Sequence, residues 1–99
     1  MADRTTKTFY LTDEAISKLR SSVLFSGMTE NSQGMLEEFL QTALGGMNRV
    51  GKKLLDARLN KSRDLLSHEE QINFWPGLKA EIESLLSIEI IQPTTKRSV

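Results

Sequence analysis

A short alternating segment near the start of the chain constrains the fold more than any other feature. The segment TKTFYL, residues 6–11, has the two-residue period of a β-strand and is rich in residue types that favour strands. Its two faces carry Lys7, Phe9 and Leu11 on one side and Thr6, Thr8 and Tyr10 on the other. The later apolar segments have helical spacing or length, so this strand has no evident partner within the chain. Because an unpaired strand leaves its backbone groups unsatisfied, we expect it to pair with the same strand of a second copy.

Two helices are predicted directly after this strand. The first runs through LTDEAISKLRSSVLFSG, with Thr12 as its N-cap and Gly27 as its stop. The second follows the candidate capping residues Thr29, Asn31 and Ser32, within MTENSQGMLEEFLQTALGGM, and ends at Gly45 and Gly46. Both helices carry apolar residues at spacings of three and four, which predicts one buried face on each.

The remaining sequence predicts three more helices. One extends from about Met47 to Leu66. A short one, SHEEQINFW, begins with the capping-box pair Ser67 and Glu70 and is stopped by Pro76. The last is LKAEIESLLSIEII, whose final SIEII is compatible with either a helix or an extended segment. We therefore expect a mostly α protein with one short N-terminal strand, a loose arm at residues 1–4 and a disordered tail at residues 92–99.

Composition excludes several classes of protein. The 99 residues make about one domain, 38% apolar and 26% charged, which is ordinary for a globular protein. The sequence has no apolar run long enough to span a bilayer and no secretory signal at its start, so we expect a cytoplasmic protein without a membrane partner. With no cysteine and the single histidine His68, it offers neither disulfides nor the usual zinc ligand sets.

The sequence shows no pattern typical of an enzyme. The adjacent acids Glu37 and Glu38 point in different directions on a helix, and Glu69 and Glu70 fit a helix start. His68 lies in a first helical turn, where a surface or capping role is expected. The segment SGMTENSQG lacks the lysine of phosphate-binding loops. We expect a protein that is not an enzyme and needs neither cofactor nor metal.

Charge is divided between two blocks although the net charge is zero. Between residues 47 and 63, six basic residues stand against one acid, a net charge of +5, and between residues 64 and 91 six acids stand against one lysine, a net charge of −5. Exposed helix faces are often charged in this way. The alternative is that the basic block contacts phosphates. The basic residues are Arg49, Lys52, Lys53, Arg58, Lys61 and Arg63.

The order of strand, capped helix, polar turn and second helix resembles the ribbon-helix-helix family of DNA-binding proteins, which includes the methionine and Arc repressors. The resemblance covers Thr5 to about Leu44 and rests on KTFYLTDEAISKL and TENSQGMLEEFLQTAL. Two features depart from the family pattern: the segment between the helices is slightly long, and the outer strand residues are not arginine-rich. The division that follows is a ribbon-helix-helix region at residues 1–46, a helical extension at residues 47–91, and the tail.

The resemblance implies a homodimer whose antiparallel ribbon enters the major groove of double-stranded DNA. The base-contacting residues would be Thr6, Thr8 and Tyr10. The phosphate-contacting residues would be Asn31 and Ser32 at a helix N-terminus, with Lys52 and Lys53 from the basic block. The shared dimer core would hold Phe9, Leu11, Leu36, Phe39 and Leu40.

This resemblance predicts a small transcriptional repressor. Two other interpretations stay open. In one, the chain is an antitoxin or plasmid-partition protein that uses its C-terminal helices to bind a partner protein. In the other, it is purely a protein–protein interaction module. Residues such as Leu54, Leu59 and Trp75 keep the first of these open, although most residues of this kind are expected to belong to the core.

Overall fold

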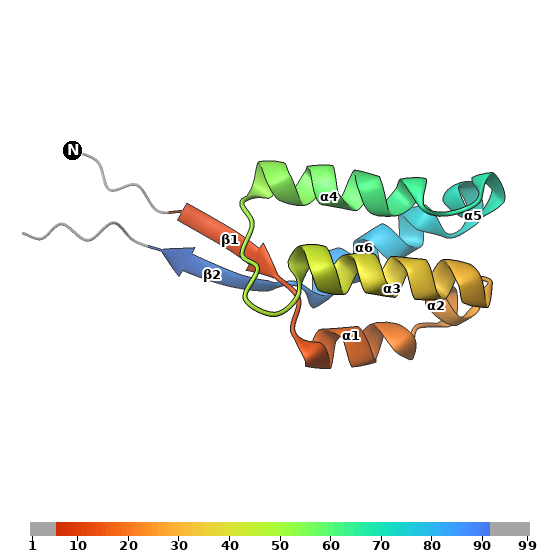
Figure 1. Cartoon of the computed structure of the whole chain (residues 1–99), viewed down its shortest axis with the longest axis horizontal. Helices are drawn as coiled ribbons and strands as arrows, with labels where there is room; N and C mark the ends of the chain where they lie inside the picture. The colour runs from red at the N-terminus through yellow and green to blue at the C-terminus, as the bar shows by residue number, and fades with distance from the viewer. Residues whose placement is uncertain (1–5, 92–99) are drawn as a thin grey trace, which may run out of the picture.

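The computed structural model describes residues 6–91, so the predictions for the arm at residues 1–4 and the tail at residues 92–99 lie outside it. Within this range the protein is mostly helical, as predicted, with one small antiparallel sheet (Figure 1). The elements in chain order are β1 (Thr6–Tyr10), α1 (Asp13–Arg20), α2 (Val23–Ser26), α3 (Glu30–Leu44), α4 (Lys52–Asp64), α5 (His68–Asn73), α6 (Trp75–Leu85) and β2 (Ser87–Ile91).

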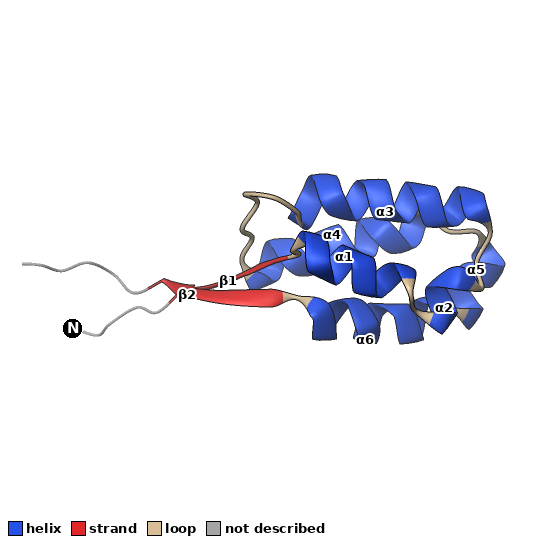
Figure 2. Ribbon diagram, turned by 90° about the horizontal axis from the view of Figure 1, so that it is seen from below, coloured by secondary structure: helices blue, strands red, loops and turns tan. Residues whose placement is uncertain are grey.

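The sheet consists of the first and last of these elements. β1 pairs antiparallel with β2, with Thr6 opposite Ile91 and Tyr10 opposite Ser87. The two strands lie side by side and extend from one end of the helical part of the molecule (Figures 1 and 2). The prediction of a single strand is therefore wrong, and the extended alternative for SIEII is correct. The partner of β1 lies about 80 residues away in the chain, so no local pattern indicates the pairing. The isoleucines of SIEII do not decide between a helix and a strand.

The other edge of β1 meets the segment that follows α3. The backbone N–H of Phe9 donates to the carbonyl of Val50 at 2.8 Å, and the N–H of Val50 donates to the carbonyl of Phe9 at 3.1 Å. The backbone groups of Phe9 thus point away from β2. In an antiparallel ladder this makes Phe9 and Ile88 a non-hydrogen-bonded pair, and Lys7 and Ile90 the next one.

Side-chain caps begin most of the helices. The hydroxyls of Thr12, Ser22, Thr29 and Ser67 each accept a hydrogen bond from the backbone three residues later. The caps at Thr12 and Thr29 and the capping box at Ser67 were predicted. The cap at Ser22 was not, and it divides the predicted first helix into α1 and α2. Ser22 also donates to the carboxylate of Glu81 on α6, a tertiary contact that favours the break.

Two helix boundaries differ from prediction because of neighbouring extended backbone. α4 begins at Lys52 rather than near Met47, since Val50 is bonded to β1 and cannot be helical. Pro76 is not the residue at which the short helix ends, because α5 ends at Asn73. It lies in the first turn of α6, where the missing N–H of proline costs no hydrogen bond.

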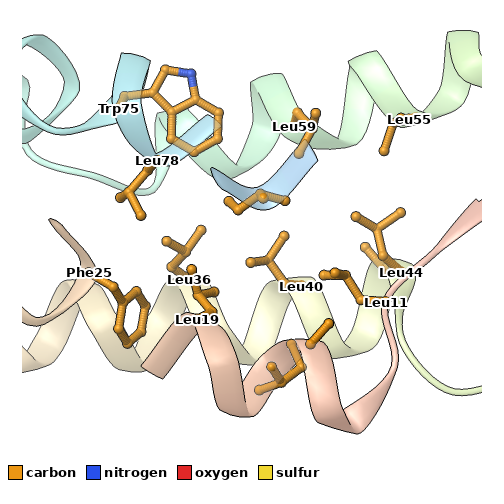
Figure 3. Close-up of a cluster of buried hydrophobic side chains, with 14 of the residues drawn as sticks. Leu11, Leu19, Phe25, Leu36, Leu40, Leu44, Leu55, Leu59, Trp75 and Leu78 are labelled. Carbon is orange, nitrogen blue, oxygen red and sulfur yellow. The ribbon is translucent and has the colours of Figure 1, made fainter. Parts of the chain in front are cut away.

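A single core joins α1, α2, α3, α4 and α6, while the buried residue of the short α5 is Glu70. Figure 3 shows Leu36 and Leu40 of α3 pointing toward Leu59 of α4, and these three side chains are fully buried. Residues before and after Gly46 contribute to the same cluster, so the two regions distinguished in the sequence share one core. Gly46 has a φ of 64°, the left-handed conformation that glycine adopts without strain.

Candidate nucleic-acid interface

The strand residues expected to contact bases lie on one face of the β1–β2 sheet. Thr6 is exposed, but Thr8 is only 9% exposed and its hydroxyl donates to the carbonyl of Glu89 at 3.3 Å. In the single chain Thr8 is therefore covered because β2 lies beside it, and its contact with bases from the ribbon of a dimer stays a prediction. Tyr10 is half-buried.

Arg49 covers part of this same face. Its guanidinium carbon lies 3.5 Å from the centroid of the Tyr10 ring, and its Nε donates to the carboxylate of Glu89 at 2.9 Å. A further bond runs from Arg49 Nη1 to the carbonyl of Gly46 at 3.1 Å. Arg49, a member of the basic block, thus links the loop before α4 to both strands. The sequence places these residues far apart, so their contact could not be predicted locally.

The N-terminus of α3 is occupied by a carboxylate of the chain itself. Asn31 is exposed, whereas Ser32 is 5% exposed and its hydroxyl donates to Glu70 at 2.6 Å. The backbone N–H of Thr29 donates to the other oxygen of Glu70 at 3.1 Å. In this conformation Glu70 already supplies the anion that such a helix end attracts, and the contact of Asn31 and Ser32 with a phosphate stays a prediction.

Glu70 links two helix starts. Besides its bonds to the start of α3, it accepts from the backbone N–H and the hydroxyl of Ser67 at the start of α5, at 3.1 and 3.0 Å. Burial by itself would raise the pKa of Glu70. The hydrogen bonds from Ser32, Ser67 and Thr29 outweigh that effect and lower the pKa to about 2. The capping box was predicted from sequence, and its contact with α3 was not.

The basic residues of α4 are largely at the surface. Lys52 is exposed and pairs with Asp56 at 3.1 Å, one helical turn away, and Arg63 pairs with Asp64 at 3.3 Å. Lys53 is exposed as well. These positions fit a solvated helix face and equally allow contact with phosphates, so both interpretations of Lys52 and Lys53 stay open.

The residues assigned to a shared dimer core are packed within one chain. Leu11, Leu36 and Leu40 are at most 2% exposed, and Phe9 and Phe39 are partly buried against the same cluster. Their burial therefore does not require a second copy. The homodimer itself stays a prediction.

An apolar groove between α3 and α4 was not expected from the sequence. Phe39 lines both parts of it. Leu54 lines one part and is 45% exposed, and Met35 lines the other and is 37% exposed. The groove contains two open hollows of about 240 and 310 Å³. The signal available in the sequence was the position of Leu54 on α4, which lies about 100° around the helix from the buried Leu55.

The surroundings of Glu37 and His68, which were considered as catalytic candidates, are described in the structure. Glu37 pairs with Arg20, whose hydrogen bond keeps the pKa of Glu37 below its usual value, and His68 is exposed. Within residues 6–91, no three histidine or carboxylate side chains gather as metal ligands would. In the same range every helix is too short or too polar to cross a membrane.

Comparison with known protein families, with curated proteins and with solved structures finds no match. The function must therefore be inferred from the residues and their geometry.

Proposed function

We propose that this chain is a homodimeric, sequence-specific DNA-binding protein of the cytoplasm that acts as a small transcriptional repressor. One observation carries the proposal: residues 6–44 contain a strand, a helical segment and a second helix in the order that the ribbon-helix-helix resemblance requires. The N-caps Thr12 and Thr29 stand at the predicted places.

The proposal requires the β1–β2 sheet to open. An intermolecular ribbon needs the edge of β1 that β2 covers in the single chain, so β2 must leave β1 when two chains pair. That release would uncover Thr8, and Thr6, Thr8 and Tyr10 would then lie on the side of the ribbon that faces bases. The DNA-bound dimer and the single-chain sheet are therefore alternative conformations of the same strand.

A disulfide can lock the single-chain sheet. Lys7 and Ile90 form a non-hydrogen-bonded pair, the type whose side chains lie closest, and the chain has no cysteine of its own. In the double variant Lys7→Cys, Ile90→Cys, we expect the oxidised protein to be a monomer of about the 11.2 kDa chain mass that does not bind DNA. The reduced form of the same sample is the control, and it should dimerise and bind. Equal DNA binding by both forms would overturn the ribbon mechanism.

The preferred DNA site can be found by selection from a random pool of genomic fragments. The protein is incubated with the pool, and the retained fragments are sequenced. We expect enrichment of a short site with two-fold symmetry, as a homodimer requires. Replacing Lys52 and Lys53 by alanine should weaken binding to all fragments and reduce the salt dependence, because phosphate contacts carry no base information. Retention without any enriched sequence would contradict specific binding.

A second candidate is a protein–protein interaction module, which includes the antitoxin and plasmid-partition interpretations. The observation that favours it is the pairing of β1 within its own chain, since the fold then needs no second copy. Sedimentation at micromolar concentration separates the two candidates. A stable monomer that retains no DNA would favour the interaction module.

A further inference from the structure

The groove between α3 and α4 has an apolar floor, a basic wall on α4 and one acid, Glu38, on α3. Phe39 of α3 and Leu54 and Ala57 of α4 supply the apolar surface, and Leu54 and Ala57 are exposed. Arg58 and Lys61 lie beside them on α4, three residues apart and hence on one side of the helix. From Leu54 to Leu65 this side of α4 is about 16 Å long, which is three helical turns.

Arg58 carries the clearest sign of a missing partner. Its Nε is buried, yet among the residues that the structure describes no acceptor forms a hydrogen bond with it. Buried donors of this kind are uncommon, because water is lost and nothing replaces it. A carboxylate is the natural acceptor for a guanidinium, and it would also be attracted by Lys61.

We propose that this groove binds an amphipathic helix of a partner protein that carries at least one carboxylate next to its apolar face. The apolar residues of that helix, spaced three and four apart, would cover Phe39 and Leu54. Its acid would accept from Arg58 and lie near Lys61. Charge complementarity with Arg58 and Lys61 selects an acidic partner over a basic or neutral one.

A second copy of this chain does not supply such a helix from residues 6–91. The apolar side chains of the acidic helix α6, including Leu78 and Ile82, are already in the core. The exposed Ile72 belongs to α5, which has only six residues and is too short to fill a groove of three turns. Because no helix among the described residues of a second copy fits, we assign the groove to a different protein. This inference is independent of the DNA-binding proposal, because its test contains no DNA.

The test uses a display library of 16-residue helical peptides, selected on the full chain. We expect the retained peptides to combine apolar residues at helical spacing with Asp or Glu beside them. Retention should be lost on Leu54→Asp, which places a charge in the groove at an exposed position. The matched control is Ile72→Asp, at another exposed apolar residue that lies outside the groove, which should retain the same peptides.

Arg58→Met separates the acidic contact from apolar burial, because methionine keeps the stem and removes the guanidinium. We expect it to weaken binding of a selected acidic peptide about tenfold, the size of one charge-assisted contact, and to leave the Glu→Gln form of that peptide unchanged. Several results would overturn the proposal: no retained peptides, retained peptides without acids, or equal binding by Leu54→Asp. If Leu54→Asp alone converts a dimer into a monomer in sedimentation, the groove holds a second copy and the partner proposal is wrong.

Discussion

The bonds of Glu70 predict a large and pH-dependent contribution to stability. Glu70→Gln keeps the size of the side chain but removes its charge and places an amide N–H₂ where donors of the protein already point. The pKa of Glu70 is lowered from its ordinary 4.5 to about 2. At about 1.4 kcal/mol per pH unit, this difference corresponds to roughly 3 kcal/mol of unfolding free energy.

The sign of the pH dependence follows from the direction of the shift. A carboxyl whose pKa is lower in the folded state stabilises the fold fully above the unfolded pKa of 4.5, and this stabilisation disappears as the pH falls through about 2. We therefore expect Glu70→Gln to lower the unfolding free energy by roughly 3 kcal/mol at pH 7 and by about half as much at pH 3. Near pH 2 most of the difference between the two proteins should be lost.

Urea denaturation followed by circular dichroism at pH 7, 4 and 3 measures this difference. The matched control is Glu69→Gln, the exposed neighbour on the same short helix, which should change the unfolding free energy by less than about 0.5 kcal/mol. A loss below about 1 kcal/mol for Glu70→Gln at pH 7 would show that the four hydrogen bonds do not outweigh burial of the charge. A loss that stays constant with pH would show that the ionised carboxylate is not its source.

Three further predictions concern the core, the backbone and the strand. Leu59→Ala should lower the unfolding free energy by about 2 to 5 kcal/mol, whereas Leu54→Ala, at a 45% exposed position, should cost less than about 1 kcal/mol in the same urea experiment. Gly46→Ala should cost about 1 kcal/mol because φ is 64°, while Gly34→Ala inside α3, where an added Cβ meets nothing within 4 Å, should raise the melting temperature. Thr8→Ala should cost about 1 kcal/mol by calorimetry, since its hydroxyl is bonded to Glu89; no loss would mean that the strand is open in solution.

The helices could be predicted because their signals are local. Thr12, Thr29 and Ser67 are capping residues whose acceptors bond to the backbone three residues away, and the apolar spacing of α3 is visible within 15 residues. The pairing of β2 with β1 could not be read in this way, since SIEII fits a helix or a strand until its distant partner is known. The break between α1 and α2 at Ser22 could not be predicted for the same reason, because it depends on a contact with the distant Glu81.

The candidate site was predicted less well than the helices. The alternation of β1 correctly placed Thr8 and Phe9 on opposite faces, but exposure is decided by what covers each face. Thr8 is covered through β2 and Ser32 through Glu70, and both partners come from the second half of the chain. Lys53 lies at the surface because it is on the side of α4 away from the buried Leu55 and Leu59, and Lys52 is exposed as the first residue of the helix.

The pairing of the first and last elements sets the order in which the protein can be completed during synthesis. β1 leaves the ribosome before the other described elements and β2 after them, so β1 waits for all six described helices before its partner exists. Closing a loop of this length also costs more entropy than forming the helical contacts, which favours late formation of the sheet. Until then the edge of β1 is free. Two nascent chains on neighbouring ribosomes therefore have an interval in which their first strands can meet, and that interval ends when residues 87–91 emerge.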